Sequence, residues 1–294
     1  MKPIAVHIFN PWHDMALASF SPNYQPRASA IKMAEDLALL PRWIAEDGDV
    51  LLLPDFSACT IVDGQLKSTD FPKPGVSYEF KPWGWDQLIH SQLCSQFPDQ
   101  ELPSIDYLGV VRKLSSRQFA VETLNALHKR IPGVFIGESY FCTDLSSIAN
   151  LAKKYPRLLM KQLWSSSGKG LRRLDGNFEV PLQNWCARSI QLHGGVVVEP
   201  RYERIMDFAM EFIAEKQGVS FCGYSVFLTS DTGKYAGNII DSEENLERSI
   251  LKQYGESDIN SRWNREEKPV RQMAADAGIF SHCRFDCGDL FRYE

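Results

Sequence analysis

The chain has 294 residues, of which 44% are hydrophobic, 12% aromatic and 23% charged, and its formal net charge is −5. This composition is that of an ordinary globular protein and excludes large-scale disorder, while the length allows two or three lobes. The sequence has no long basic run that would bind nucleic acid or an anionic membrane, so we expect small-molecule partners.

Neither a signal peptide nor a membrane span is predicted. The apolar stretch at residues 4–9 is too short for a signal peptide, and no later run approaches the length that spans a bilayer. The seven cysteines are scattered and form no CxxC pair, so we interpret them as reduced thiols. These features together predict a cytoplasmic protein.

The first predicted strand ends in a polar cluster. Residues 4–9 form a β-branched and aromatic run that stops at Asn10-Pro11. In an open α/β sheet, ligands bind at the carboxyl ends of the strands, which makes His13 and Asp14 candidates for substrate contact. An equally weighted alternative is that Asp14 caps a short helix and His13 lies on the surface.

A helix and a second strand are expected next. Residues 28–45 carry apolar side chains at helical spacing with a break at Pro41, and residues 49–54 form a second buried strand. A strand, a helix and a strand at this distance predict a parallel crossover unit. Arg27, directly before the helix, is a candidate ligand for a substrate anion, although a lone arginine is more often solvated.

Residues 55–82 are rich in turn signals and predict a small hairpin. Asp86 fits the N-cap of the amphipathic helix that follows, and it is also a candidate on the substrate side. Trp83 and Trp85 flank a glycine and either line a pocket or pack in the core, with packing favoured. We place a domain boundary near Pro103.

Residues 158–200 contain the most informative pattern. An apolar run ends in Lys161 and passes into a loop of serine and glycine, and a second apolar run ends in Glu199. A lysine at the end of a buried strand, a small-residue loop that can cover phosphates and an acid on a second strand together describe a nucleotide clamp. Each piece alone has an ordinary interpretation, because strand-end lysines are usually solvated and such loops are common.

After this region, apolar and polar residues alternate along the chain. Residues 207–213, 219–228 and 234–240 predict an antiparallel meander, and residues 242–254 predict a helix with acids in its first turn. Two familiar nucleotide motifs are excluded, since no Walker A loop and no GxGxxG after the first strand occur.

In this order, the elements from about Leu114 to Ile240 resemble the ATP-grasp superfamily of carboxylate–amine ligases, and the start of the chain resembles uncharacterised bacterial ATP-grasp proteins. The resemblance implies a mixed α/β (α+β) ATP-grasp fold. Its expected parts are an N-terminal parallel α/β pre-ATP-grasp domain at 1–102, a first lobe with a Ser/Gly-rich lid at 103–195, and a second lobe with an antiparallel sheet at 196–294.

The resemblance also implies roles for individual residues. Lys161 would contact the α- and β-phosphates, and Arg117 and Lys169 would be further catalytic cations. The lid would consist of Ser165, Ser166, Ser167, Gly168 and Gly170. The adenine would be held by Glu199 with the backbone of Pro200 and Arg201, and the ribose hydroxyls by Asp207.

The implied metal is magnesium, held in the superfamily by an acid on one late strand and a Glu-x-Asn pair on the next. Asp286 is the implied first ligand, and Glu211 is a second candidate. No Glu-x-Asn follows Asp286 before the sequence stops at Glu294, so we expect the second lobe to be truncated at its C-terminal end.

The implied cofactors are ATP and Mg²⁺, and the implied activity is ATP-dependent ligation of a carboxylate to an amine through an acylphosphate. The candidates for the acceptor side are His13, Asp14, Arg27 and Asp86. A homodimer is among the expected assemblies. The alternative is a catalytically impaired ATP-binding regulatory module without the complete metal site, and phosphoryl transfer to a hydroxyl is a third interpretation.

Overall fold

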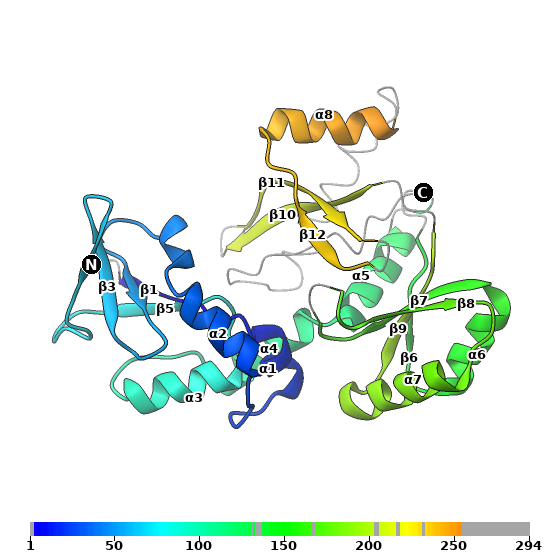
Figure 1. Cartoon of the computed structure of the whole chain (residues 1–294), viewed down its shortest axis with the longest axis horizontal. Coiled ribbons are helices and arrows are strands. Elements are labelled where there is room, and N and C mark those ends of the chain that lie inside the picture. Colours follow the sequence, from blue (N-terminus) through cyan, green and yellow to red (C-terminus); the bar gives the residue numbers. More distant parts are fainter. Residues whose placement is uncertain are drawn as a thin grey trace. The chain divides into compact units, whose positions relative to one another are not determined.

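The computed structural model describes residues 3–130, 132, 137–165, 168–202, 206–215, 218–230 and 233–254. The chain divides into two compact units, Met1–Ser116 and Arg117–Glu294, shown in Figure 1. The first unit contains a sheet with parallel strands and the second contains antiparallel sheets, so the predicted mixed α/β class is confirmed. None of the described helices has the length and apolar character that crossing a bilayer requires.

A five-stranded sheet in the order β4-β3-β2-β1-β5 forms the centre of the first unit. The first strand pairs in parallel with β2 and β5, which confirms the predicted crossover unit, and β3 and β4 form the predicted hairpin. The strands are β1 (Ile4–Ile8), β2 (Val50–Leu52), β3 (Ala58–Val62), β4 (Gln65–Ser68) and β5 (Tyr78–Pro82). The helices are α1 (His13–Ser19), α2 (Ala28–Asp36), the 3-10 helix η1 (Leu40–Trp43), α3 (Gln87–Gln96) and α4 (Ile105–Leu114).

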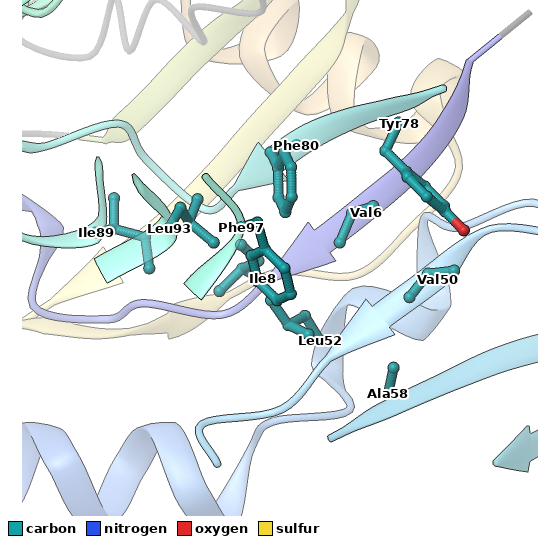
Figure 2. Close-up of a cluster of buried hydrophobic side chains, with 10 residues drawn as sticks. All are labelled: Val6, Ile8, Val50, Leu52, Ala58, Tyr78, Phe80, Ile89, Leu93 and Phe97. Atoms are coloured by element: carbon teal, nitrogen blue, oxygen red, sulfur yellow. The ribbon is translucent and has the colours of Figure 1, made fainter. Parts of the chain in front are cut away.

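One hydrophobic cluster joins this sheet to α3 (Figure 2). Apolar side chains of β1, β2 and β5 meet those of α3, because central parallel strands are covered and therefore consist largely of β-branched and aromatic residues. The labelled members are Val6, Ile8, Val50, Leu52, Ala58, Tyr78, Phe80, Ile89, Leu93 and Phe97. Trp85 packs against the same cluster, as the favoured interpretation predicted, whereas Trp83 is half-exposed.

The first unit is longer than the predicted domain at 1–102 because α4 belongs to it. Arg112 on α4 donates from Nε to the carbonyl of Leu17 at 3.0 Å and from Nη2 to that of Ala18 at 3.1 Å. Its guanidinium also lies 5.2 Å from the ring centroid of Phe20. These contacts fasten α4 to the end of α1, and the division therefore falls after Ser116.

The second unit contains a four-stranded antiparallel sheet in the order β6-β9-β7-β8. Because β9 pairs with both β6 and β7, the predicted boundary between residues 195 and 196 lies next to the start of a central strand rather than between two lobes. The elements are α5 (Arg117–Arg130), β6 (Tyr140–Cys142), α6 (Leu145–Lys154), β7 (Arg157–Gln162), β8 (Leu171–Asp175), α7 (Val180–His193) and β9 (Val196–Pro200).

A second sheet of this unit is the predicted meander, in the order β10-β11-β12 with antiparallel neighbours. Its apolar face packs against α5 and α8 in one cluster. The buried members are Leu124, Leu127, Phe208, Met210, Phe212, Val226, Leu246 and Ile250. The elements are β10 (Asp207–Glu215), β11 (Gly218–Thr229), β12 (Tyr235–Asn238) and α8 (Glu243–Tyr254).

Candidate functional site

Lys161 is a buried cation near the end of β7. Its side chain is 1% exposed, and Nζ lies 2.9 Å from Oε2 of Glu199, whose side chain is 14% exposed. In the β7–β9 register Glu199 is opposite Leu159, two residues before Lys161, which puts both charged side chains on one face of the sheet. Ser139 donates from Oγ to the other carboxylate oxygen of Glu199 at 3.1 Å. The structure thus brings together Lys161 and Glu199, which the sequence pattern assigned to one nucleotide clamp.

Arg117 holds the beginning of the Ser/Gly-rich loop. Its Nη1 donates to the carbonyl of Gln162 at 2.6 Å and to Ser165 Oγ at 2.9 Å, and its Nη2 donates to the carbonyl of Ser165 at 2.9 Å. Its backbone N–H donates to the carbonyl of Leu163 at 3.1 Å. The role that this geometry supports is positioning of the loop, whereas the phosphate contact of Arg117 stays a prediction.

Two glycines allow the loop to close. The N–H of Gln162 donates to the carbonyl of Gly170 at 2.9 Å, and a Cβ on Gly170 would overlap Cβ and Oγ of Ser165. Gly168 has a φ of +74°, and a Cβ there would overlap the backbone carbonyl of Gly233 in the turn between β11 and β12. The loop therefore lies against the second sheet of its unit at a distance that only glycine permits.

Three other residues of the loop, Ser166, Ser167 and Lys169, were also predicted to act at the phosphates. Lys169 is exposed at the loop. Ser166 and Ser167 lie outside the described residues, so their contribution to the lid stays a prediction.

The residues predicted to hold adenine and ribose are partly used by the sheets. The N–H of Arg201 donates to the carbonyl of Arg157 at 3.0 Å, and its guanidinium forms a bidentate pair with Asp175 at 2.8 and 2.5 Å. Pro200 is buried at the end of β9. Asp207 accepts a hydrogen bond from Thr229 Oγ1 at 2.7 Å. In this arrangement the Arg201 N–H is used by the β7–β9 pairing, and the adenine contact of Glu199 with the backbone of Pro200 and Arg201 stays a prediction.

The predicted metal ligands are not brought together in the part of the chain that the structure describes. Asp286 lies outside it, Glu211 is on β10, and no group of three His, Cys, Asp or Glu side chains gathers there. A Glu-x-Asn triplet does occur earlier, at residues 243–245, in the first turn of α8. Glu243 accepts a hydrogen bond from the N–H of Tyr224 at 2.9 Å. Its helical position differs from the strand that the resemblance requires.

A second polar cluster lies in the first unit, where β1 and β5 end. The buried Asp86 carboxylate accepts from the N–H of Ile89 at 3.0 Å, which confirms the predicted N-cap of α3. Its other oxygen accepts from Asn10 Nδ2 at 3.1 Å and lies 3.6 Å from His13 Nδ1. Two candidates for the substrate side, His13 and Asp86, are therefore neighbours.

The other two substrate candidates lie on α1 and before α2. The residue at the N-cap position of α1 is Trp12, and Asp14 lies inside the first turn, so the alternative in which Asp14 caps this helix is wrong. Arg27 is exposed directly before α2. Burial raises the pKa of Tyr24, while the charge of Arg27 lowers it and that of Asp86 raises it further, so the Tyr24 phenol lies within electrostatic range of both.

Comparisons with known proteins give only structural matches. No protein-family model matches the chain, and no curated protein matches its sequence. The chain is similar to N5-carboxyaminoimidazole synthetase from Staphylococcus aureus complexed with ADP, at 10% identity and a TM-score of 0.41, with 85% of this chain and 62% of that chain covered. It is similar to D-alanyl-alanine synthetase A from Vibrio cholerae at 12% identity and a TM-score of 0.41, with coverage of 89% and 81%.

A third match is the biotin carboxylase–β,γ-ATP complex from Campylobacter jejuni, at 16% identity and a TM-score of 0.46, with 68% of this chain and 43% of that chain covered. The chain thus spans less than two thirds of the length of two of these three structures.

Proposed function

We propose that the chain is an ATP-grasp ligase, which uses ATP to join a carboxylate to an amine. One observation carries the proposal. Strand β7 supplies the buried Lys161, which is paired with Glu199, and the chain passes from β7 directly into a loop whose glycines allow it to close. A buried ammonium is costly unless an anion accompanies it, so a protein that keeps one has a use for the charge.

The hydrogen-bonding and charged groups of this site fit a nucleoside triphosphate. The ammonium of Lys161 is a compact positive charge in a dry environment, which suits phosphate oxygens. Gly168 and Gly170 let the loop pack closely on Gly233 and Ser165, and the backbone N–H groups of the loop would cover the phosphates. The Glu199 carboxylate is an acceptor for the exocyclic amine of adenine. Lys169 on the loop and Asp207 on β10 would complete the set.

The pair between Lys161 and Glu199 explains how the charge is kept ready before a nucleotide binds. The carboxylate compensates the ammonium in its buried position, and Ser139 and the β9 backbone fix the carboxylate. A phosphate oxygen would compete with Glu199 for the same ammonium, so binding exchanges one anion for another without exposing the cation to water. Arg117 would hold the loop start in place during this exchange.

Bound ATP would supply a phosphoryl group that activates the carboxylate as an acylphosphate for attack by the amine. The contribution of the chain is to hold the phosphates with Lys161 and to exclude water with the loop. Magnesium is expected with ATP, and Glu211 and Asp286 are the residues proposed to hold it. The described residues do not bring a ligand set together, so we assign no step to the metal.

Nucleotide protection against thermal unfolding tests the proposal. ATP should raise the melting temperature of the wild type, by an amount that corresponds to about 2.7 kcal/mol at a ligand concentration of 100 times Kd. Lys161→Met should abolish the shift. Lys32→Met is the matched control, because the Lys32 side chain is 72% exposed on α2 and far in sequence from the site. Absence of a shift in the wild type would remove the nucleotide proposal.

The ligase part needs a second measurement. Phosphate release should appear when mixed amino acids and carboxylates are added to the protein with ATP and magnesium, and amide products should be detectable by mass spectrometry. If ATP binds, with or without magnesium, and no phosphate is released, the chain is the nucleotide-binding regulatory module instead.

A further inference from the structure

The polar cluster at the carboxyl ends of β1 and β5 is built around two residues of the first unit. Asn10 follows β1, and Asp86 follows β5. Because Ile8 and Pro82 are partners in parallel strands, the segments that follow them meet at one edge of the sheet. Asn10 fastens these segments together, since its Nδ2 donates to the carbonyl of Gly84 at 2.8 Å and its Oδ1 accepts from the Gly84 N–H at 3.2 Å. The same Nδ2 reaches Asp86.

The buried carboxylate of Asp86 is fixed from two sides. One oxygen accepts from the N–H of Ile89 and the other from Asn10, and the side chain is 0% exposed. A buried carboxylate that stays ionised needs further positive charge or donors. A titratable group beside it is the imidazole of His13, whose Nδ1 lies 3.6 Å from Asp86 Oδ2.

The imidazole of His13 is held by a close contact with the backbone. A Cβ on Gly84 would overlap three atoms of the ring, namely Cγ, Cδ2 and Nε2, so the ring lies directly against the glycine backbone. Any side chain at position 84 would displace the ring. Gly84 therefore fixes the plane of the imidazole, as Asp86 fixes its direction.

The two ring nitrogens of His13 differ in their surroundings. Nδ1 is buried and has no hydrogen-bond partner among the residues that the structure describes, while it faces the Asp86 carboxylate just beyond hydrogen-bond distance. Nε2 is not buried in this way, and the side chain is 18% exposed. A proton on Nδ1 is attracted by Asp86, so Nε2 keeps its lone pair and is accessible as a base. Such contacts often shorten only when a ligand binds.

Further groups at this edge point to the kind of ligand. The indole Nε1 of Trp12 is a buried donor that has no partner in the described part of the chain, and a buried donor without an acceptor is costly. Arg27 is an exposed cation whose charge acts on Tyr24, and the Tyr24 phenol is also within range of Asp86. The site thus offers one base together with a buried N–H donor that suits a carboxylate oxygen.

We infer that His13, oriented by Asp86, accepts a proton from a small amine that carries a carboxylate, such as an amino acid, with the Trp12 indole N–H as a donor to the carboxylate. The inference rests on the proposed ligase function and names its amine substrate. The N–H bond of the ammonium breaks and a bond to Nε2 forms, which gives a neutral amine and an imidazolium whose charge Asp86 offsets. Nothing is oxidised or reduced, and the neutral amine is the nucleophile that ligation requires.

Nitrogen NMR of the full chain with isotope-labelled histidine tests the site without ATP. In its neutral form, the His13 ring should carry its proton on Nδ1. Addition of common amino acids should shift the His13 signals and leave those of His90 in place. Asp86→Asn keeps the cap acceptor for Ile89 but presents an amide donor to Nδ1, so it should move the proton to Nε2. A wild-type ring protonated at Nε2, or no response to any amino acid, would overturn the inference.

Turnover provides the second readout. His13→Gln should lower kcat for amino-acid-dependent phosphate release by about 100-fold or more. The KM for ATP should be unchanged. His90→Gln is the matched control, because His90 lies in the same unit and contacts the carbonyl of Pro103 at 2.9 Å. Equal losses in both variants would contradict the role of His13.

The two proposals can fail separately. If ATP gives no thermal shift, the ligase proposal fails, whereas the NMR titration still reports whether an amine binds at His13. If ATP binds and is consumed while the His13 signals ignore every amino acid, the amine site is wrong and the nucleotide site stands.

Discussion

Lys161 and Glu199 form a buried ion pair across β7 and β9, with Nζ and Oε2 separated by 2.9 Å. Their proximity comes from strand register, because Glu199 is opposite Leu159 and thus diagonal to Lys161 on the same face. Such a pair matters for stability mainly because removal of one partner leaves the other charge buried without its counterion.

Removal of one partner should therefore cost more than removal of both. Lys161→Met leaves the Glu199 carboxylate in a site that is 14% exposed, and we expect a loss of about 3 kcal/mol in the free energy of unfolding. The double variant Lys161→Met/Glu199→Gln should recover most of this loss, because the introduced glutamine amide is neutral and retains an acceptor for Ser139. Urea unfolding of the wild type, Lys161→Met, Glu199→Gln and the double variant gives the coupling energy. If the changes in the free energy of unfolding are additive, the two side chains do not form a coupled pair.

The loop glycines should be intolerant of alanine. In Gly170→Ala the new Cβ overlaps Ser165, and we expect a destabilisation of about 1–3 kcal/mol together with weaker nucleotide binding. Gly109→Ala is the control, because Gly109 lies inside α4 and its Cβ would have Phe20 as its neighbour at 4.0 Å. That substitution should stabilise the chain by about 0.5–1 kcal/mol. Chemical denaturation of both variants checks the contrast.

The loss of folding stability at low pH should depend in part on Asp144, the N-cap of α6. Hydrogen bonds from the Ser146 hydroxyl and from the N–H and hydroxyl of Ser147 lower the pKa of Asp144 from 3.8 to about 2. Because the folded pKa is depressed, the stabilising contribution is fully present above pH 3.8 and is lost as the pH falls towards 2.

Asp144→Asn keeps a capping oxygen but does not titrate. We expect the wild type to be more stable than this variant at about pH 5, and the difference to shrink as the pH falls to about 2. Urea unfolding at a series of pH values measures the difference. A constant gap between the two proteins over this range would contradict the assignment.

The cysteines should react in two classes. Burial raises the pKa of Cys142 to about 11 and that of Cys186 to about 12, so both stay protonated thiols at neutral pH. Cys94 and Cys222 are exposed free thiols and should be alkylated by iodoacetamide in the folded protein. Peptide mapping by mass spectrometry should find the buried pair modified only after denaturation, and early labelling of Cys142 would contradict its burial.

Local signals in the sequence predicted the elements and their order well. The run at residues 4–9, the alternation from residue 207 and the cap at Asp86 each depend on side chains within a few positions, and the structure confirms them. The five described cysteines are free, as their spacing predicted. The strand at Tyr78–Pro82 was not predicted, because it ends in proline within a turn-rich segment and is recognised only by its pairing with β1.

The geometry of the sites depends on contacts between distant residues, which local patterns do not specify. Arg117 reaches Ser165 over 48 positions, whereas its assignment as a phosphate cation was implied by the family resemblance and by its place near a helix start. The buried partner of Asp86, Asn10, is 76 positions away. Burial of these groups is decided by the packing of whole sheets, so the sequence identified the participating residues more readily than their roles.

The strand order β6-β9-β7-β8 also has a consequence for synthesis on the ribosome. The hairpin of β7 and β8 is local and can form early, but in the described sheet β6 is paired only with β9, which emerges about fifty residues later in the chain. Until β9 arrives, Lys161 has no Glu199 beside it, and the nascent sheet presents the edge of β7 to other chains. Completion of the ion pair and protection of this edge are therefore the same late folding event.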